Sequence, residues 1–383
     1  MHFYSSIWRT GSYQFRNEFE DVKILHAGSL GRPVVGIIRQ LQMESRAARE
    51  LAKGKNIQWD VLYFAPIPSA LAGSELLFLK QFPESKLVSI NMLRARANLF
   101  RLLRQQINEY DYVLLRWPAG DPLLWLYRDI FRDVYTIHHA REIDEFKSSG
   151  LTGRLRAILE RAMGNVLLSK VKGIIGVTPE IASYEIERIN AFKNSFIFPN
   201  GVDYDMVPML KRTPSPLVTF FMSASYFSPW HGLDLAVAHL QQRADSFVFH
   251  IVGTVPQYIV RMIAGDSRFI LHGFKSPQEI MSIMAGSDVG LSSLALFRKG
   301  MEQACPLKVR EYLAAGLPVI SGHADSALPL DFPYYRQISI QEIDLLNQAL
   351  EMRKYSPDEI RSSAREHIEK VRIMERLAEE MCK

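Results

Sequence analysis

Short apolar runs alternate with longer helix-like stretches along this chain, and this alternation constrains its fold more than any other feature. Runs such as VKILHA (22–27) and FVFHIV (247–252) are typical of strands that are buried on both faces. Separated by helices, such strands form parallel sheets covered on both sides. The expected strands lie at 22–27, 60–64, 87–90, 112–116, 134–138, 173–178, 218–222, 247–252, 269–271, 289–292 and 319–321. The expected helices lie at 36–53, 93–109, 151–170, 179–190, 233–242, 277–285, 307–315, 340–352 and 357–383.

The alternation stops at residues 202–216, where Pro208, Pro214 and Pro216 break the pattern, and then starts again. A chain of 383 residues also exceeds one ordinary core. We therefore predict an α/β protein with two doubly wound, Rossmann-like domains that face each other across a cleft. Ligands of such sheets bind beyond the carboxyl ends of the strands. The predicted units are an N-terminal domain (1–203), a C-terminal domain (204–360) and a C-terminal helix that returns to the first domain (361–383).

The composition is that of a globular protein, with 48% hydrophobic and 23% charged residues. Cys305 and Cys382 give neither a disulfide framework nor metal-ligand spacing. The start does not resemble a signal peptide, and we find no apolar run of ~18 residues, so we expect a cytoplasmic protein. A net charge of +5 favours phosphate-bearing ligands or an anionic membrane surface and is too small to indicate nucleic acid.

The segment CPLKVREYLAAGLPVISG (305–322) predicts a short helix followed by a buried strand. Pro306 suits the start of the helix and Gly316 its end. Lys308 and Glu311 would lie on one face of the first turns. A helix N-terminus beside a lysine suits a phosphate group, and a carboxylate one turn further suits two sugar hydroxyls. Together they indicate a nucleotide site, although an ordinary surface Lys–Glu pair has the same spacing.

PLKVREYLAAGLPVIS (306–321) resembles the signature of family 4 (group 1) retaining glycosyltransferases, which have the GT-B fold. Three further parts of the chain agree in order and spacing: 173–203, 226–239 and the strands from 247 to 294. The resemblance implies transfer of a hexose from a nucleotide-diphosphate sugar to a hydroxyl of a glycan or glycolipid. It also implies retained anomeric configuration and no metal or other cofactor.

By this resemblance, Glu311 would hold the ribose hydroxyls and Lys308 the diphosphate. His138, at the end of VYTIH, would contact the donor sugar, although His139 beside it competes for that place. Gln303 stands where the family has an acidic residue. We predict catalytic roles for His138, Lys308 and Glu311. The predicted substrate-binding residues are Gly28, Arg141, Tyr226, His231, Gly232, Gly253, Gly273, Gln303 and Leu307.

Several of these residues also have simpler interpretations. His231 could pack on Trp230, Arg141 could pair with solvent-exposed acids, and Gly28 could belong to a plain turn. The expected partners are a UDP- or GDP-linked sugar, a glycan or lipid-linked acceptor of bacterial surface polysaccharide synthesis, and no nucleic acid. The basic stripe Arg94, Arg101 and Arg104 is compatible with peripheral contact with an anionic membrane or with an ordinary charged helix face.

Two other functions fit the same fold. One is a nucleotide-sugar epimerase, which would need several carboxylates in the cleft. The other is a non-catalytic nucleotide-binding subunit, for which Gln303 in place of an acidic residue is the indication.

Overall fold

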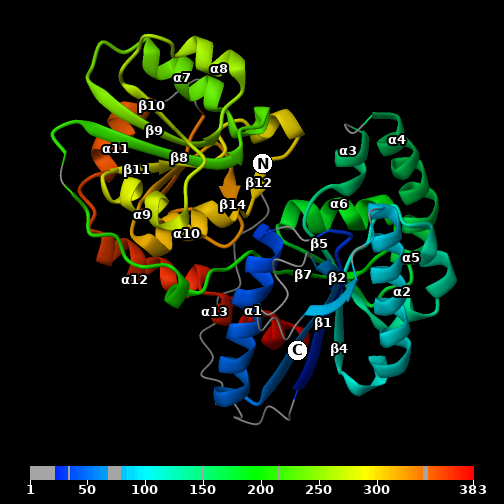
Figure 1. Cartoon of the computed structure of the whole chain (residues 1–383). Coiled ribbons are helices and arrows are strands. Elements are labelled where there is room, and N and C mark those ends of the chain that lie inside the picture. Colours follow the sequence, from blue (N-terminus) through cyan, green and yellow to red (C-terminus); the bar gives the residue numbers. More distant parts are fainter. Residues whose placement is uncertain are drawn as a thin grey trace, which may run out of the picture.

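The computed structural model describes residues 22–32, 35–67, 79–83, 85, 87–147, 150–213, 215–339 and 344–383. Within them the chain forms two α/β domains, each built on a parallel sheet with helices packed around it (Figure 1). The predicted fold class is confirmed. The expected first domain, 1–203, is described from residue 22 onward.

The first sheet has seven strands in the described residues, in the order β3-β2-β1-β4-β5-β6-β7. The order reverses between β1 and β4, which is where such sheets bind ligands. The strands are β1 (Val22–Ser29), β2 (Ile57–Ile67), β3 (Leu79–Pro83), β4 (Tyr112–Arg116), β5 (Tyr135–His138), β6 (Gly173–Gly176) and β7 (Asn194–Ile197). The helices are α1 (Val35–Gly54), α2 (Val88–Gln106), α3 (Glu142–Lys147), α4 (Gly150–Leu159), α5 (Asn165–Leu168) and α6 (Pro179–Ile189).

The second sheet has the order β10-β9-β8-β11-β13-β15, and β12 pairs separately with β14. The strands are β8 (Val218–Tyr226), β9 (Phe247–Thr254), β10 (Phe269–Gly273), β11 (Val289–Leu291), β12 (Gln303–Ala304), β13 (Val319–Ser321), β14 (Ala324–Asp325) and β15 (Tyr335–Gln337). The helices are α7 (Leu233–Gln241), α8 (Gln257–Met262), α9 (Pro277–Ala285), α10 (Leu307–Ala315), α11 (Leu345–Met352), α12 (Pro357–Ile368) and α13 (Lys370–Met381). Among the described helices, none combines the length and the apolar content needed to cross a membrane.

Most predicted elements are present, but three predictions differ from the structure. Residues 87–90 were expected as a strand, yet they begin α2, and the neighbouring strand is β3. A short apolar run fits either state, so periodicity alone could not decide. Of the helix expected at 340–352, residues 340–343 lie outside the described residues, and α11 begins at Leu345 after the N-cap residue Asp344. The helix expected at 357–383 is broken at Glu369, which adopts an extended conformation.

The chain crosses between the domains twice, and the two crossings are hydrogen-bonded to each other. Val202 N donates to Ile368 O, and Lys370 N donates to Val202 O. Each N···O distance is 2.9 Å. Beyond this point α13 packs on the first domain, and Tyr112 Oη donates to Met381 O at 2.7 Å (Figure 1). The buried side chains of α13 join the core around β1, β2 and α1; they are Ile373, Met374, Leu377, Ala378 and Met381.

Candidate functional site

The first turn of α10 holds a buried ammonium group without a partner. Pro306 caps the helix and Gly316 ends it in the left-handed conformation (φ 89°), so the predicted bounds are confirmed. Lys308 Nζ is buried and has no hydrogen-bond partner among the described residues. Burial lowers the pKa of Lys308 to about 8, and the nearby Glu311 opposes this shift. A buried ammonium group whose hydrogen bonds are unmade is costly, so this position favours an anionic ligand that would accept them.

The positive charge of Lys308 acts on the nearby His231 and disfavours its protonation, so His231 is not a second cation. Its Nδ1 accepts a hydrogen bond from Ser228 N at 2.9 Å, so its Nε2 carries the hydrogen. Burial, with Lys308, lowers the pKa of His231 to about 3. Its ring also packs on Trp230, with ring centroids 5.8 Å apart. The histidine therefore supplies a neutral N–H donor and a packing contact together.

The glycines predicted to bind substrate serve mainly to bring chain segments together. At Gly253 (φ 119°) a Cβ would collide with Ala224 O, and at Gly28 it would collide with the Tyr63 ring. At Gly232 (φ 70°) it would lie 2.9 Å from Leu294 Cβ. Gly273 (φ 65°) faces open space. Its left-handed conformation therefore explains the glycine without a packing requirement.

Glu311 forms an ion pair between the two domains. Its Oε1 lies 2.8 Å from Arg39 Nη1 on α1. Burial raises the pKa of Glu311, and Arg39 and Lys308 oppose that rise. Both residues line a cavity of about 260 Å³ whose other walls come from α9 and the 206–208 segment. Arg39 was not predicted, because a pairing across domains leaves no local signal in the sequence.

Gln303 and Arg141, both predicted to bind substrate, form contacts between the domains in this structure. Gln303 N donates to Glu180 Oε2 at 2.8 Å, and Gln303 Oε1 accepts from Glu180 N at 3.1 Å. Arg141 Nη1 donates to Gly300 O at 2.7 Å, and its guanidinium stacks on Tyr184. The side-chain oxygen of Gln303 is thus engaged at the start of α6 and not directed to a donor sugar.

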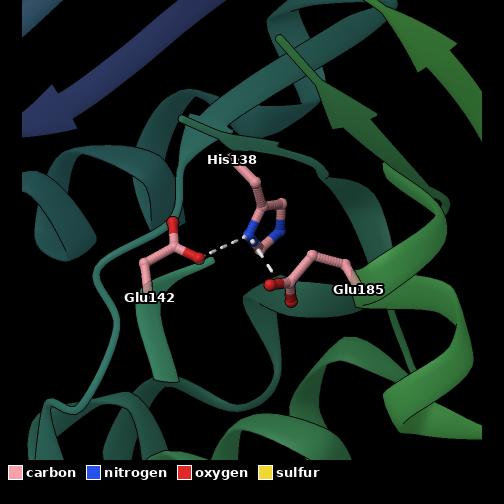
Figure 2. Close-up of side chains that lie close together, drawn as sticks. All are labelled: His138, Glu142 and Glu185. Carbon is pink, nitrogen blue, oxygen red and sulfur yellow. Dashed lines mark ion pairs between the residues drawn. The ribbon is translucent and has the colours of Figure 1, made fainter. Parts of the chain in front are cut away.

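His138 is fully buried within the first domain, so its side chain is not exposed to a ligand in this structure, and its contact with a donor sugar stays a prediction. It shares a side of β5 with Thr136, two residues earlier, and accordingly Nε2 lies 3.1 Å from Thr136 Oγ1. Its other ring nitrogen faces Glu142 of α3 and Glu185 of α6 (Figure 2). The partly exposed histidine is His139, whose pKa burial holds well below its ordinary value.

Two of the residues predicted to bind substrate lie at the surface of the second domain. Tyr226, at the end of β8, is 57% exposed, and Leu307 at the first position of α10 is partly exposed. A larger cavity of about 1030 Å³ lies apart from Lys308, and Leu294, Met301 and Tyr335 are among its walls. Of the two cavities, the smaller one is lined by Glu311 of the signature motif, together with Arg39 of the first domain.

Comparison with known proteins supports the interpretation of the second domain and of the fold. Residues 217–329 match the family model described as glycosyl transferases group 1. No curated protein sequence matches the chain. The structure is similar to the lipopolysaccharide outer core galactosyltransferase WaaB in its apo form (TM-score 0.61, 14% identity, 94% of this chain and 100% of that one). It is also similar to HepE from Anabaena in complex with UDP and glucose (TM-score 0.59, 14% identity, 94% and 99%).

A glycosyltransferase from Rickettsia africae gives a TM-score of 0.62 at 13% identity, over 95% of this chain and 100% of that one. At these identities the likeness concerns the fold. This chain thus shares the GT-B fold of solved glycosyltransferases, and its second domain matches the group 1 glycosyl transferases.

Proposed function

We propose that this protein is a retaining glycosyltransferase that moves a hexose from a UDP- or GDP-linked sugar to an acceptor hydroxyl. The observation that carries the proposal is the buried, unpartnered ammonium of Lys308, which lies one turn before Glu311 at the start of α10, within the described residues. The group 1 match covers this helix, and HepE was solved with UDP and glucose. The proposed transfer uses no metal or other cofactor.

In the proposed reaction the bond between the anomeric carbon and the diphosphate oxygen breaks. The acceptor oxygen bonds to the same face of that carbon, and its proton passes to the leaving phosphate. Negative charge develops on that phosphate, where the Lys308 ammonium, the His231 Nε2–H and the backbone N–H groups of the first helical turn would stabilise it. The ion pair between Glu311 and Arg39 would break on binding, and Glu311 would then accept hydrogen bonds from the ribose hydroxyls.

The first test measures nucleotide affinity, by calorimetry with UDP and GDP. We expect Glu311→Ala to lose about 1.5–3 kcal/mol of binding free energy, because hydrogen bonds to a charged group are lost. Arg39→Ala is the matched control, since it removes the same ion pair and leaves the carboxylate in place. Unchanged affinity in Glu311→Ala would remove the basis of the proposed site.

A second test separates the three candidate functions. A thermal-shift screen of UDP-, GDP- and ADP-linked sugars would first identify the donor, because a bound ligand raises the apparent stability. Donor consumption that depends on an added glycan or lipid-linked acceptor supports the transferase. Epimerised nucleotide sugar formed without an acceptor would identify an epimerase, and binding without any turnover would identify a non-catalytic subunit.

We further propose that the acceptor is a lipid-linked surface glycan, reached at the cytoplasmic face of an anionic membrane. Of the stripe predicted on α2, Arg94 and Arg101 are exposed and Arg104 pairs with Asp129 at 2.8 Å. A cavity of about 450 Å³ lies beside this pair. Its walls contain four cationic residues and one acid, together with Leu126: Arg104, Arg128, Arg132, Lys170 and Asp129.

Helix α4 of the same domain carries an exposed apolar face and the exposed cations Arg154 and Arg156. Leu151, Leu155 and Ile158 of α4 are 79%, 66% and 65% exposed, and their spacing places them on one side of the helix. Exposed apolar residues beside cationic ones are typical of surfaces that bind anionic membranes. We expect sedimentation with phosphatidylglycerol vesicles, and not with phosphatidylcholine vesicles, and loss of binding in Leu155→Glu. Equal binding to both vesicles, or to neither, would contradict this surface.

A further inference from the structure

Three side chains from different elements of the first domain converge on one point. They are His138 of β5, Glu142 of α3 and Glu185 of α6, and 0%, 18% and 1% of these side chains is exposed. His138 Nδ1 lies 3.6 Å from a carboxylate oxygen of each glutamate. This distance is too long for a hydrogen bond. Figure 2 shows both carboxylates directed at the same ring nitrogen.

The hydrogen bonding of the imidazole determines what it offers to the two carboxylates. Nε2 lies 3.1 Å from Thr136 Oγ1, and with Nε2–H donating there, Nδ1 presents its lone pair to the glutamates. Within the described residues, His138 Nδ1, Glu142 Oε2 and Glu185 Oε1 are buried and have no hydrogen-bond partner. The carboxylate oxygens nearest Nδ1 are Glu142 Oε2 and Glu185 Oε2, and of these three atoms only Glu185 Oε2 accepts a hydrogen bond within the described residues, from Arg188 Nε at 2.6 Å. Acceptors that face one another repel, and a cation between them would relieve the repulsion.

The charges around this point have the same imbalance. Arg188 lies 2.6 Å from Glu185 Oε2 and 2.7 Å from Glu160 Oε1. Glu160 also accepts hydrogen bonds from Trp117 Nε1 and Gly120 N. The Arg188 guanidinium is thus paired with Glu185 and Glu160. Among the described residues, Glu142 has no cationic side chain within ion-pair distance apart from the His138 imidazole. Excess negative charge in a buried cluster is neutralised either by protons or by a bound cation.

We propose that His138, Glu142 and Glu185 bind a divalent transition-metal ion of the zinc or manganese type. Imidazole nitrogen and carboxylate oxygen ligands lie about 2.0–2.2 Å from zinc, so two ligands of a tetrahedral ion are about 3.4 Å apart. The two measured separations of 3.6 Å are close to this value. The imidazole ligand favours zinc over magnesium and calcium, which prefer oxygen ligands, and the two carboxylates also suit manganese. The Thr136 contact would orient the ring from the outer shell, as is usual for metal-bound histidines.

The ion would fix two helices that contact the second domain. Arg141, next to the ligand Glu142, reaches Gly300, and Lys299 Nζ lies 2.6 Å from Glu145 Oε1 on α3. Helix α6 begins at the Glu180–Gln303 contact. The proposed ion therefore has a structural role in holding α3 and α6. It contacts no group of the proposed donor site, so the proposal does not depend on the proposed reaction.

The experiment uses the full chain after chelator treatment, titrated with Zn²⁺ and with Mn²⁺ by calorimetry. We expect one ion per chain and, with Co²⁺ as a probe, a visible absorption band from the bound metal. His138→Ala and Glu185→Gln should weaken binding by more than the ~10–100-fold typical of outer-shell changes. The control is His272→Ala, because His272 Nε2 and His250 Nδ1 lie 2.9 Å apart and form a histidine pair outside the proposed site.

Each outcome of this titration decides the proposal. Stoichiometric binding that His138→Ala removes and His272→Ala leaves intact supports the site. Binding that survives His138→Ala, or that only His272→Ala removes, overturns it, as does no binding by the unaltered protein, because protons would then balance the charge. If circular dichroism shows that His138→Ala or Glu185→Gln does not fold, Glu142→Gln serves instead, since Glu142 is the least buried ligand.

Discussion

Helix α10 carries two cations two residues apart, and they have opposite surroundings. Arg310 is fully buried and pairs with Asp325, with Nη2 donating to Asp325 Oδ1 at 2.7 Å. Its Nε donates to Asn200 O at 2.8 Å. Burial disfavours its charge, but Asp325 raises the pKa of Arg310 above its ordinary value. Lys308 has no such partner within the described residues, and burial lowers its pKa.

The difference separates structural charge from charge that is available to a ligand. Every guanidinium nitrogen of Arg310 has an acceptor, including Cys305 Sγ at 2.7 Å from Nη2, so a ligand could add little. The Lys308 ammonium keeps its hydrogen-bonding capacity unused at the start of a helix, where the helix dipole also favours anions. Within one helix, the cation with satisfied hydrogen bonds stabilises the fold, and the cation with unused hydrogen-bonding capacity is the one assigned to the proposed site.

The largest expected effect is on the free energy of unfolding and comes from removing Arg310, the cation with satisfied hydrogen bonds. Arg310→Met should lower the free energy of unfolding by about 3–5 kcal/mol, because Asp325 would remain buried without its cation. Urea denaturation followed by tryptophan fluorescence measures this. The double variant Arg310→Met, Asp325→Leu should recover most of the loss. A single-variant loss below about 1 kcal/mol would mean that the pair is not structural.

For Lys308, the cation without hydrogen-bond partners among the described residues, the effect of substitution should appear in nucleotide binding and not as a loss of stability. Lys308→Met should weaken nucleoside diphosphate binding about 10–100-fold, because charge-assisted hydrogen bonds to the phosphates are lost. Its free energy of unfolding should equal or exceed that of the unaltered protein, since an unpaired buried charge is removed. The exposed Lys211, changed to Met, is the control and should alter neither quantity. A Lys308→Met variant that is less stable yet binds normally would reverse the comparison.

The pH dependence gives a third test. Lys308 has a folded-state pKa of about 8, below its ordinary value of 10.5, so between these values the unfolded chain holds more protons. Its contribution to the free energy of unfolding should therefore rise with pH in this window. Nucleotide affinity should instead fall as pH rises through about 8, by at most ~10-fold per pH unit, because the ammonium is lost. Lys308→Met should lack both trends, and identical pH profiles would contradict the assignment.

The smallest expected effect concerns the ion pair of Glu311, which lies on the same face of α10 as Lys308, with Arg39. Arg39→Ala removes a partly exposed ion pair with Glu311, so the free energy of unfolding should fall by only about 0.2–1 kcal/mol. Nucleotide affinity should not weaken, because the Glu311 carboxylate becomes available. Calorimetry beside Glu311→Ala checks this, and an equal loss in both variants would show that the ion pair, not the carboxylate, matters for binding.

The parts of the structure that local chemistry determines could be predicted from the sequence. Helix α10 is bounded by Pro306 and Gly316, whose effects on the backbone are independent of the fold. The orientation of His138 could not be predicted, because it depends on α3 and α6 covering that side of β5. Arg39 was missed for the same reason: its contact with Glu311 joins residues 272 positions apart, on different domains. The contact between Gln303 and Glu180 likewise exists only in the assembled protein.

The return of α13 to the first domain has a consequence for synthesis. The ribosome makes the strands of the first sheet first, but Ile373, Met374 and Leu377, which complete the core around β1 and α1, emerge only after the whole second domain. Until then the first domain exposes the apolar surface that α13 covers. A nascent chain of this protein therefore carries an unfinished, aggregation-prone first domain while the second domain is being made, so α13 determines when this core can be completed.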